Sequence, residues 1–229
     1  DSLKSDVNLM INRLRESGIT MAPEAGSQFL RDVIDKNLSL TEIVDAVKLA
    51  SSNSSKGIKL YFMIGLPRET MADIDAIVQL AFDLIDDIKP GKNKIVINVS
   101  SFVPKPYTPF QWCAQDDKET LEAKLKFLKQ GLRHRQLELR WTDPALTWLE
   151  GILSRGDERV GDIIERAFKK GACFDAWYDH FEPSRWFEAM SETNIPEDEY
   201  QLARTLDSSL PWGFIDMGMR LSVIKKEYE

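Results

Sequence analysis

The stretch GIKLYFMIGLPRET, residues 57–70, decides the fold of this chain. It opens with an apolar run over residues 58–64 that is broken only by Lys59, and Gly65 and Pro67 end the run. Short runs rich in β-branched and aromatic residues are typical of strands in parallel sheets, where neighbouring layers cover both faces. We therefore predict a strand over residues 58–64 that is buried on both faces.

A helix is predicted directly after this strand. Thr70 and Asp73 have the spacing of a capping box, in which the two residues satisfy backbone N–H groups of the first helical turn. Apolar residues follow at helical spacing as far as Ile88. A strand, a tight loop and a helix in this order form half of a βαβ unit, and α/β proteins build their sites on such loops.

The same arrangement repeats on both sides of the central strand. Short strands are predicted over residues 19–22 and 95–99, and a helix begins at Ser39, where Glu42 completes a second capping box. Crossovers of about thirty residues are typical of parallel βαβ repeats. Right-handed crossovers would build either an arc of a barrel or a small open sheet. Residues 137–141 are either a further strand or an extended segment.

Two domains are predicted, an α/β domain over residues 1–113 and a mainly helical domain over residues 114–229. The segment 102–112 contains three prolines, which remove donors and restrict the residues before them, so it is extended. The tryptophans of the second half are interpreted as core residues rather than base-stacking platforms. They are Trp141, Trp148, Trp177, Trp186 and Trp212.

The composition narrows the class of protein. The chain has 229 residues, is 43% hydrophobic and has a formal net charge of −7, which argues against a general binder of nucleic acids or membrane surfaces. No apolar run approaches the length of a membrane span, so we expect a cytoplasmic protein without membrane contact. Cys113 and Cys173 match no zinc or iron–sulfur spacing and are interpreted as reduced thiols, so no metal ligands are predicted.

Polar side chains follow each predicted strand of the first half. Glu24 and Ser27 come after the first strand, Arg68 after the second, and Ser100 and Lys105 after the third. The carboxyl ends of parallel strands meet at one edge, where barrels carry their sites. Each residue also has a plainer interpretation, because serine can simply end a strand and a lysine between prolines is usually solvated.

Glu24 is the hardest of these residues to explain as structural, since Pro23 and Gly26 fix the backbone around it. Glu69 and Thr70, by contrast, fit the role of helix caps better than the role of ligands. The polar groups are weak signals one by one and form a stronger signal together.

Three segments resemble consecutive parts of the radical SAM superfamily, and of its bacterial Fe–S oxidoreductase-type members in particular. They are APEAGSQFLRDVIDKN from Ala22, IKLYFMIGLPRET from Ile58 and SSFVPKPYTPFQW from Ser100. The shorter GDER, FDAW and LPWGFID segments also resemble the tail of those proteins, so the resemblance covers essentially the whole chain.

This resemblance implies a partial, TIM-like (β/α)6 barrel. In that family a 4Fe–4S cluster and S-adenosylmethionine meet at the barrel, and reductive cleavage gives a 5′-deoxyadenosyl radical that takes a hydrogen atom from the substrate. The resemblance places the cosubstrate beside Glu24, Ser27, Met63, Gly65, Pro67, Ser100 and Val103, and the substrate near Lys105. Lys36 stands where relatives often carry an arginine that pairs with the cosubstrate carboxylate, although lysine lacks the arginine fork.

The cysteine triad that holds the cluster in that family is absent from this sequence. The chain therefore resembles the carboxyl-terminal half of such an enzyme, with strands four to six of the barrel and a helical extension. We expect it to bind no cluster and to be inactive alone, with the missing half of the barrel as its partner. The substrate, RNA or protein, is inferred by analogy. The exposed edge of the strand at 19–22 also predicts a homodimer.

Two other functions stay open from the sequence. The chain could be a non-catalytic binding or scaffolding module that meets its partner through the Trp-rich helices. It could also be a different α/β enzyme with a complete site of its own, in which case the isolated chain would show turnover.

Overall fold

The computed structural model describes residues 19–53, 57–87, 94–196 and 198–228. These residues divide into two compact units. The first comprises the chain up to Ser101 together with Leu121–Thr142, and the second comprises Phe102–Thr120 and residues from Asp143 onward. The predicted boundary at residue 113 does not coincide with this division, because the chain leaves the first unit at Ser101 and returns to it at Leu121.

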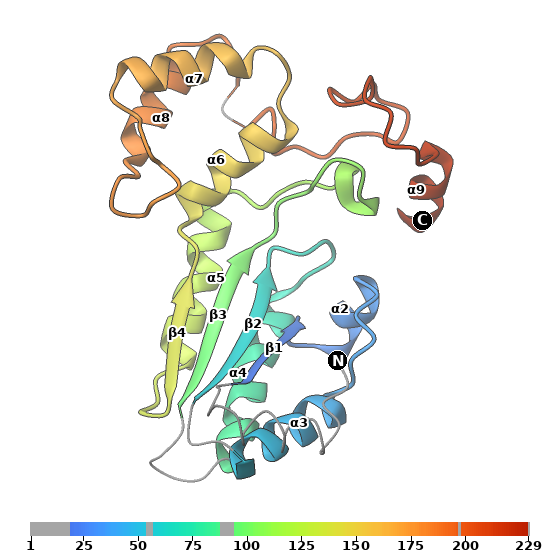
Figure 1. Ribbon diagram of the computed structural model, residues 1–229, viewed down its shortest axis with the longest axis vertical. Coiled ribbons are helices and arrows are strands. Elements are labelled where there is room, and N and C mark those ends of the chain that lie inside the picture. The colour runs from blue at the N-terminus through green and yellow to red at the C-terminus, as the bar shows by residue number, and fades with distance from the viewer. Residues whose placement is uncertain (1–18, 54–56, 88–93, 197, 229) are drawn as a thin grey trace. The chain divides into compact units, whose positions relative to one another are not determined.

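A four-stranded parallel sheet forms the centre of the first unit (Figure 1). The strand order is β1-β2-β3-β4, which confirms the α/β class. The fourth strand resolves the open prediction at residues 137–141 in favour of a strand, which pairs with β3. The strands are β1 (Ile19–Glu24), β2 (Ile58–Ile64), β3 (Ile95–Ser101) and β4 (Leu137–Trp141).

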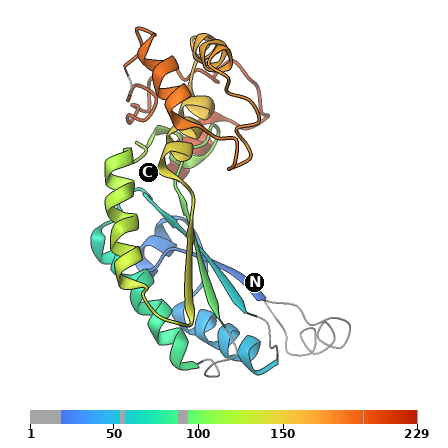
Figure 2. The same cartoon turned by 90° about the vertical axis from the view of Figure 1, so that its left-hand side faces the viewer.

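Helices pack against one face of this sheet and close the core of the first unit. The helices of this part of the chain are α2 (Gln28–Val33), α3 (Leu40–Asn53), α4 (Met71–Asp87) and α5 (Lys118–Gly131). Figure 2 shows α4 and α5 along the same side of the strands. The core joins apolar side chains of α3, α4 and α5 to inward-facing side chains of all four strands. A crossover helix after each of the first three strands is the connection that parallel strands require.

The central strand β2 is covered by described helices on one face only, so the prediction of burial on both faces is wrong. Ile58, Leu60, Phe62 and Ile64 lie in the core, whereas Lys59 and Tyr61 are exposed and Met63 is half-buried. Alternate residues of a strand point to opposite faces. We call the second face, which carries Tyr61 and Met63 of β2 together with Asn98 and Ser100 of β3, the open face.

The second unit is mainly helical, as predicted. Its helices are η1 (Pro109–Trp112), α6 (Pro144–Arg155), α7 (Val160–Lys169), α8 (Pro183–Ser191) and α9 (Leu221–Tyr228). The predicted core role is confirmed for Trp148, Trp186 and Trp212, which are buried. It is wrong for Trp141 and Trp177, which are 46% and 63% exposed.

In the part of the chain that the structure describes, no helix combines the length and the apolar character needed to cross a bilayer.

Candidate functional site

The carboxyl ends of β1, β2 and β3 bring three of the predicted residues together. Glu24 pairs in register with Phe62, and the next residue of β2, Met63, pairs with Ser100 of β3. Neighbouring strands lie about 4.8 Å apart, so the backbones of Glu24, Met63 and Ser100 fall within roughly 10 Å of one another. The Ser100 hydroxyl lies 3.4 Å from the Phe62 carbonyl oxygen, to which it donates. We call this edge the rim of the sheet.

Glu24 holds a strained position on this rim. Its φ angle is 66°, and the Ala25 N–H donates to the Pro23 carbonyl at 2.9 Å across it. This is a γ-turn with a positive central φ, the rare and strained form of that turn. Glu24 is half-buried, and no hydrogen bond or ion pair joins its carboxylate to another described residue. A strained residue with an unpaired charge is typical of a functional position.

The loop that follows β2 is held from within the chain. Gly65 and Arg68 both have positive φ angles, 81° and 69°, which the tight turn requires. The Gly65 N–H donates to Glu69 Oε1 at 2.8 Å, and Lys124 Nζ lies 2.6 Å from the same oxygen. The side chains of Glu69 and Lys124 are 2% and 10% exposed, so this ion pair is buried. Glu69 therefore has a structural role, and the N–H of Gly65 is already engaged.

Asp73 joins the two loops of the rim. Its Oδ2 accepts from the Thr70 hydroxyl at 2.7 Å and from the Thr70 N–H at 2.8 Å, and the second of these bonds is one half of the predicted capping box. Its Oδ1 accepts from the Ser27 hydroxyl at 2.5 Å. Burial raises the pKa of Asp73, but these hydrogen bonds from Ser27 and Thr70 outweigh burial and lower it. The carboxylate therefore stays charged and ties the first loop to the start of α4.

The Ser27 hydroxyl therefore both donates and accepts a hydrogen bond within the fold. Its hydroxyl oxygen also accepts from the Leu30 N–H at 3.2 Å, as the N-cap of α2. A cosubstrate contact through this hydroxyl would compete with the bond to Asp73. Pro67 lies half-buried in the loop after β2.

Arg31 is a residue of this region that the sequence analysis did not single out. It is 1% exposed and donates to the carbonyls of Leu38, Ala25 and Gly26 at 2.9 Å, 2.9 Å and 3.1 Å. Burial lowers its pKa, and the guanidinium fixes the backbone of the loop that carries Glu24. The only signal in the sequence is its place among the apolar residues of α2.

Lys36, Val103 and Lys105 occupy less central positions. Lys36 follows α2, and its ammonium makes no hydrogen bond or ion pair with a described residue. Val103 and Lys105 belong to the second unit, whereas the rim belongs to the first. Lys105 Nζ contacts Glu150 at 2.5 Å and Ser154 at 3.1 Å, both on α6.

The residues of this chain do not provide the ligands that a 4Fe–4S cluster needs. Such clusters are held mainly by cysteine thiolates, and the sequence contains two cysteines. Cys113 is partly buried, which raises the pKa of its thiol, and Cys173 is exposed. No group of three histidine, cysteine or acidic side chains converges among the described residues. An amino or hydroxyl group, in contrast, would find an unpaired acceptor in Glu24.

Fold and rim together define a mixed α/β protein with a parallel sheet and a separate helical unit. Comparison with known proteins adds one relative, an uncharacterized protein of Methanocaldococcus jannaschii that is 29% identical over 191 residues. The aligned region covers 80% of this chain and 41% of the relative, so the chain spans less than half of that protein. No protein-family model and no solved structure matches the chain.

Proposed function

We propose that this chain is the carboxyl-terminal part of a radical SAM iron–sulfur enzyme and that its rim holds S-adenosylmethionine. In this proposal β1 to β3 are strands four to six of a partial barrel, and the remainder of a longer, cytoplasmic protein supplies the cluster-binding cysteines. Reductive cleavage of the cosubstrate is the chemistry that the bound cluster would supply. The sequence segments that resemble this superfamily contain β2 and the carboxyl ends of β1 and β3, each with the loop that follows it.

The observation that carries the proposal is the unpaired carboxylate of Glu24. S-adenosylmethionine offers an ammonium group, ribose hydroxyls and a sulfonium, all of which a carboxylate favours. Met63 provides an apolar contact in the neighbouring strand, and Ser100 is exposed beside it. In this arrangement Glu24 accepts hydrogen bonds from the cosubstrate, while Met63 and the loop at Gly65 and Pro67 give it a surface to lie on.

The open face supports a site that this chain does not complete alone. A barrel turns one face of its sheet toward the interior. In this proposal the open face, on which Lys59, Tyr61, Asn98 and Ser100 are exposed or half-buried, is that interior face. The relative is more than twice as long as the aligned segment, which leaves room for the remaining strands.

The proposal is tested on the longer protein, reconstituted anaerobically with iron and sulfide. We expect it to bind iron and to produce 5′-deoxyadenosine under reducing conditions, whereas the 229-residue chain does neither. Glu24→Gln should leave the iron content unchanged and weaken S-adenosylmethionine binding at least tenfold, about 1.4 kcal/mol, because the amide loses the charge. The control is Glu165→Gln, which removes an exposed carboxylate of α7 that pairs with Lys169.

The outcomes test the radical SAM assignment and the role of Glu24 separately. If the longer protein binds no iron and forms no 5′-deoxyadenosine, the radical SAM assignment is wrong. If it does both and Glu24→Gln binds the cosubstrate as tightly as the Glu165→Gln control, the family stands and the role of Glu24 is wrong.

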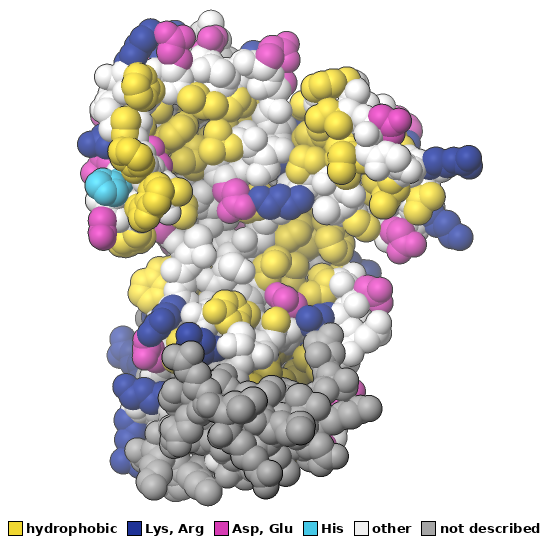
Figure 3. All heavy atoms as spheres, viewed as in Figure 1, with side chains coloured by type: hydrophobic (Ala, Val, Ile, Leu, Met, Phe, Trp, Pro, Cys, Tyr) yellow, Lys and Arg dark blue, Asp and Glu magenta, His cyan; other side chains and the backbone are white. Residues whose placement is uncertain are grey.

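A second candidate function is a binding module, which the surface of the second unit favours. Figure 3 shows hydrophobic side chains gathered on that unit. Phe174, Trp177 and Tyr178 are 69%, 63% and 79% exposed, and Phe174 and Trp177 contact edge to face. The second unit also holds a cavity of about 880 Å³ beside Trp148 and Phe187. If the longer protein binds no iron and forms no 5′-deoxyadenosine, the binding module becomes the favoured function.

A further inference from the structure

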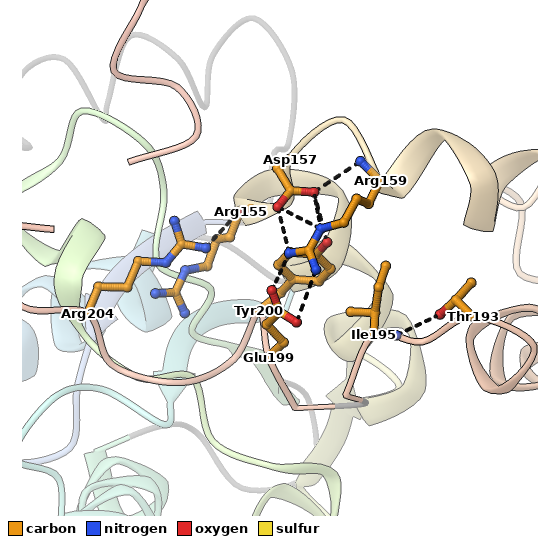
Figure 4. A network of polar contacts seen from close by, with 8 residues as sticks. All are labelled: Arg155, Asp157, Arg159, Thr193, Ile195, Glu199, Tyr200 and Arg204. Carbon is orange, nitrogen blue, oxygen red and sulfur yellow. Dashed lines mark hydrogen bonds and ion pairs between the residues drawn. The ribbon is translucent and has the colours of Figure 1, made fainter. Parts of the chain in front are cut away.

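Two arginines of the second unit lie side by side without an acidic residue between them (Figure 4). Arg155 is the last residue of α6, and its exposed fraction is 0%. Arg204 comes from the segment before α9, and its Nη2 donates to the backbone carbonyl of Arg155 at 2.8 Å. The guanidinium of Arg204 also lies over the indole of Trp212, 5.0 Å from the ring centroid. Two like charges are thus brought together in a largely buried place.

Arg155 is left with unused hydrogen-bond donors. Its Nη2 donates to the Leu202 carbonyl at 3.1 Å, whereas Nε and Nη1 are buried and form no hydrogen bond with the residues that the structure describes. Burial and the charge of Arg204 lower the pKa of Arg155 to about 10, so it remains charged at neutral pH. A buried charge and buried unpaired donors both cost free energy unless something compensates them.

The neighbouring acids do not supply that compensation. Asp157 accepts from Arg159 Nη2 at 2.7 Å and from the Tyr200 hydroxyl at 3.1 Å, and Glu199 also pairs with Arg159. The hydrogen bonds from Arg159 lower the pKa of Asp157 to about 2 despite its partial burial. Both carboxylates, Asp157 and Glu199, therefore pair with Arg159 rather than with Arg155.

The local charge is therefore positive. Arg155, Arg159 and Arg204 face two carboxylates in this cluster, which leaves an excess of one positive charge. Cys113, which interacts electrostatically with Arg155, adds no negative charge, because burial raises the pKa of its thiol.

A cavity of about 800 Å³ adjoins this cluster and carries a further unused donor. Asp157, Trp212 and Gln111 are among its lining residues, whereas Arg155 and Arg204 are not, so the cavity reaches the cluster at Asp157. Gln111 is fully buried, and its Oε1 accepts from Trp212 Nε1 at 2.8 Å and from the Tyr107 N–H at 3.1 Å. These two donors fix the orientation of the amide, and its Nε2 has no hydrogen-bond partner in the described part of the chain.

We propose that Arg155 and Arg204 bind an oxyanion, the phosphate or carboxylate group of a small molecule that enters from this cavity. Both guanidinium groups can form forked hydrogen bonds to such a group, and a single negative charge would neutralise the local excess. The unpartnered atoms of Gln111 and Arg155 are all donors, which calls for an acceptor. Gln115 Oε1, an unpartnered acceptor, packs instead at Gly151, one turn earlier in α6. The site lies wholly in the second unit and does not depend on the radical SAM proposal.

Thermal unfolding of the 229-residue chain tests this site. Sodium chloride is replaced at constant ionic strength by sodium phosphate in one series and by sodium acetate in another. We expect the unfolding temperature to rise with the logarithm of the anion concentration in at least one series, because a ligand of the folded state stabilises it by mass action. The series that responds identifies the phosphate or the carboxylate as the preferred group.

Variants separate binding from a structural role of the arginines. Arg155→Met should lose the anion-dependent rise, and in chloride it should unfold at no lower a temperature than the wild type, because the uncompensated buried charge is gone. Arg204→Lys, which keeps the charge and loses the fork, should bind phosphate at least tenfold more weakly by calorimetry. Arg185→Met should keep the full response, since Arg185 bonds the Gly171 carbonyl elsewhere in this unit.

Three results would overturn the proposal. The first is a wild-type chain that responds to neither anion. The second is an equal response in the wild type, in Arg155→Met and in Arg204→Lys, which would mean a nonspecific salt effect. The third is an Arg155→Met protein that is destabilised by the same amount in every buffer, which would mean that the arginine only holds the backbone of Leu202.

Discussion

Replacing Gly26 by alanine should destabilise the first unit strongly, because no space exists for a methyl group. A Cβ at this position would lie 2.5 Å from Ile77 N, 2.7 Å from Asp73 O and 2.8 Å from Ala76 C. These three atoms belong to the backbone of α4, which cannot rotate away as a side chain can. The φ angle of Gly26 is not in the positive region, so the cost is steric contact rather than backbone strain.

The magnitude follows from two consequences of the clash. Forcing a methyl group into a filled contact costs about 1–3 kcal/mol. Moving the loop away from α4 also stretches the 2.5 Å hydrogen bond between Ser27 and Asp73, and a bond to a charged group is worth about 1.5–3 kcal/mol. Since the loop can relieve part of the contact by stretching that bond, we expect a loss of about 3 kcal/mol rather than the full sum.

Urea unfolding with hydrogen exchange as a local probe measures this effect. A loss of about 3 kcal/mol lowers the midpoint by roughly 1–2 M, and exchange should rise in peptides from α2 and the start of α4. Gly161→Ala is the matched control, because a Cβ there meets no atom within 4 Å and alanine favours the helix α7 by about 0.5–1 kcal/mol. A Gly26→Ala protein as stable as wild type would refute the packing of this loop against α4.

Three further predictions concern polar pairs. Lys124→Met should lower stability to urea by about 3 kcal/mol, because Glu69 loses its partner in a buried ion pair, and adding Glu69→Gln should restore part of the loss. Thr70→Ala should cost about 1 kcal/mol in the same assay, because the Thr70 hydroxyl no longer donates to Asp73. The pKa of Asp157 is lowered to about 2, so its stabilising effect is present above about pH 4 and disappears between pH 4 and pH 2. Because Arg159 is largely exposed, we expect about 1 kcal/mol after screening, seen as a fall in the unfolding temperature that Asp157→Asn does not show.

The central elements were predictable because the relevant signals are local. The strand at 58–64 has the predicted bounds, and the strand at 95–99 is extended by two residues to Ser101. Apolar, β-branched runs that end in glycine or proline leave few alternatives, and the capping box of Thr70 fixes where α4 begins. The strand at 137–141 was left open because its sequence, LELRW, is half polar, as suits a strand that pairs with β3 alone at the edge of the sheet.

The division into units and the open face depend on contacts between distant residues. The proline-rich segment 102–112 suggested a boundary at its end, yet α5 returns to the sheet, where Gly131 packs closely against Val78 of α4. Lys59 looked like a single exception in an apolar run. It is one of the alternate residues that face away from the helices, and an exposed tyrosine beside it hides that pattern in the sequence.

The sequence predicted which side chains lie at the site, but it did not predict their hydrogen-bond partners. Glu24 was correctly singled out as a residue whose neighbours constrain its backbone, but its γ-turn is visible only in the structure. Ser27 has the sequence context of a rim ligand and turns out to bond Asp73. Buried arginines such as Arg31 and Arg155 escape sequence analysis, because arginine is exposed in most proteins and nothing in its immediate neighbours marks the exception.

The pattern of pairing at the rim gives the Glu24 carboxylate its significance. Around it, Ser27, Thr70 and Glu69 are all bonded within the chain. A rim whose purpose were only structural would gain nothing from leaving a strained residue unpaired, since both the strain and the lone charge reduce stability. The same reasoning applies with opposite sign to Arg155 in the second unit, where the surplus charge is positive. The first position calls for a cationic or hydroxyl-bearing ligand and the second for an anion, so one small ion could not account for both.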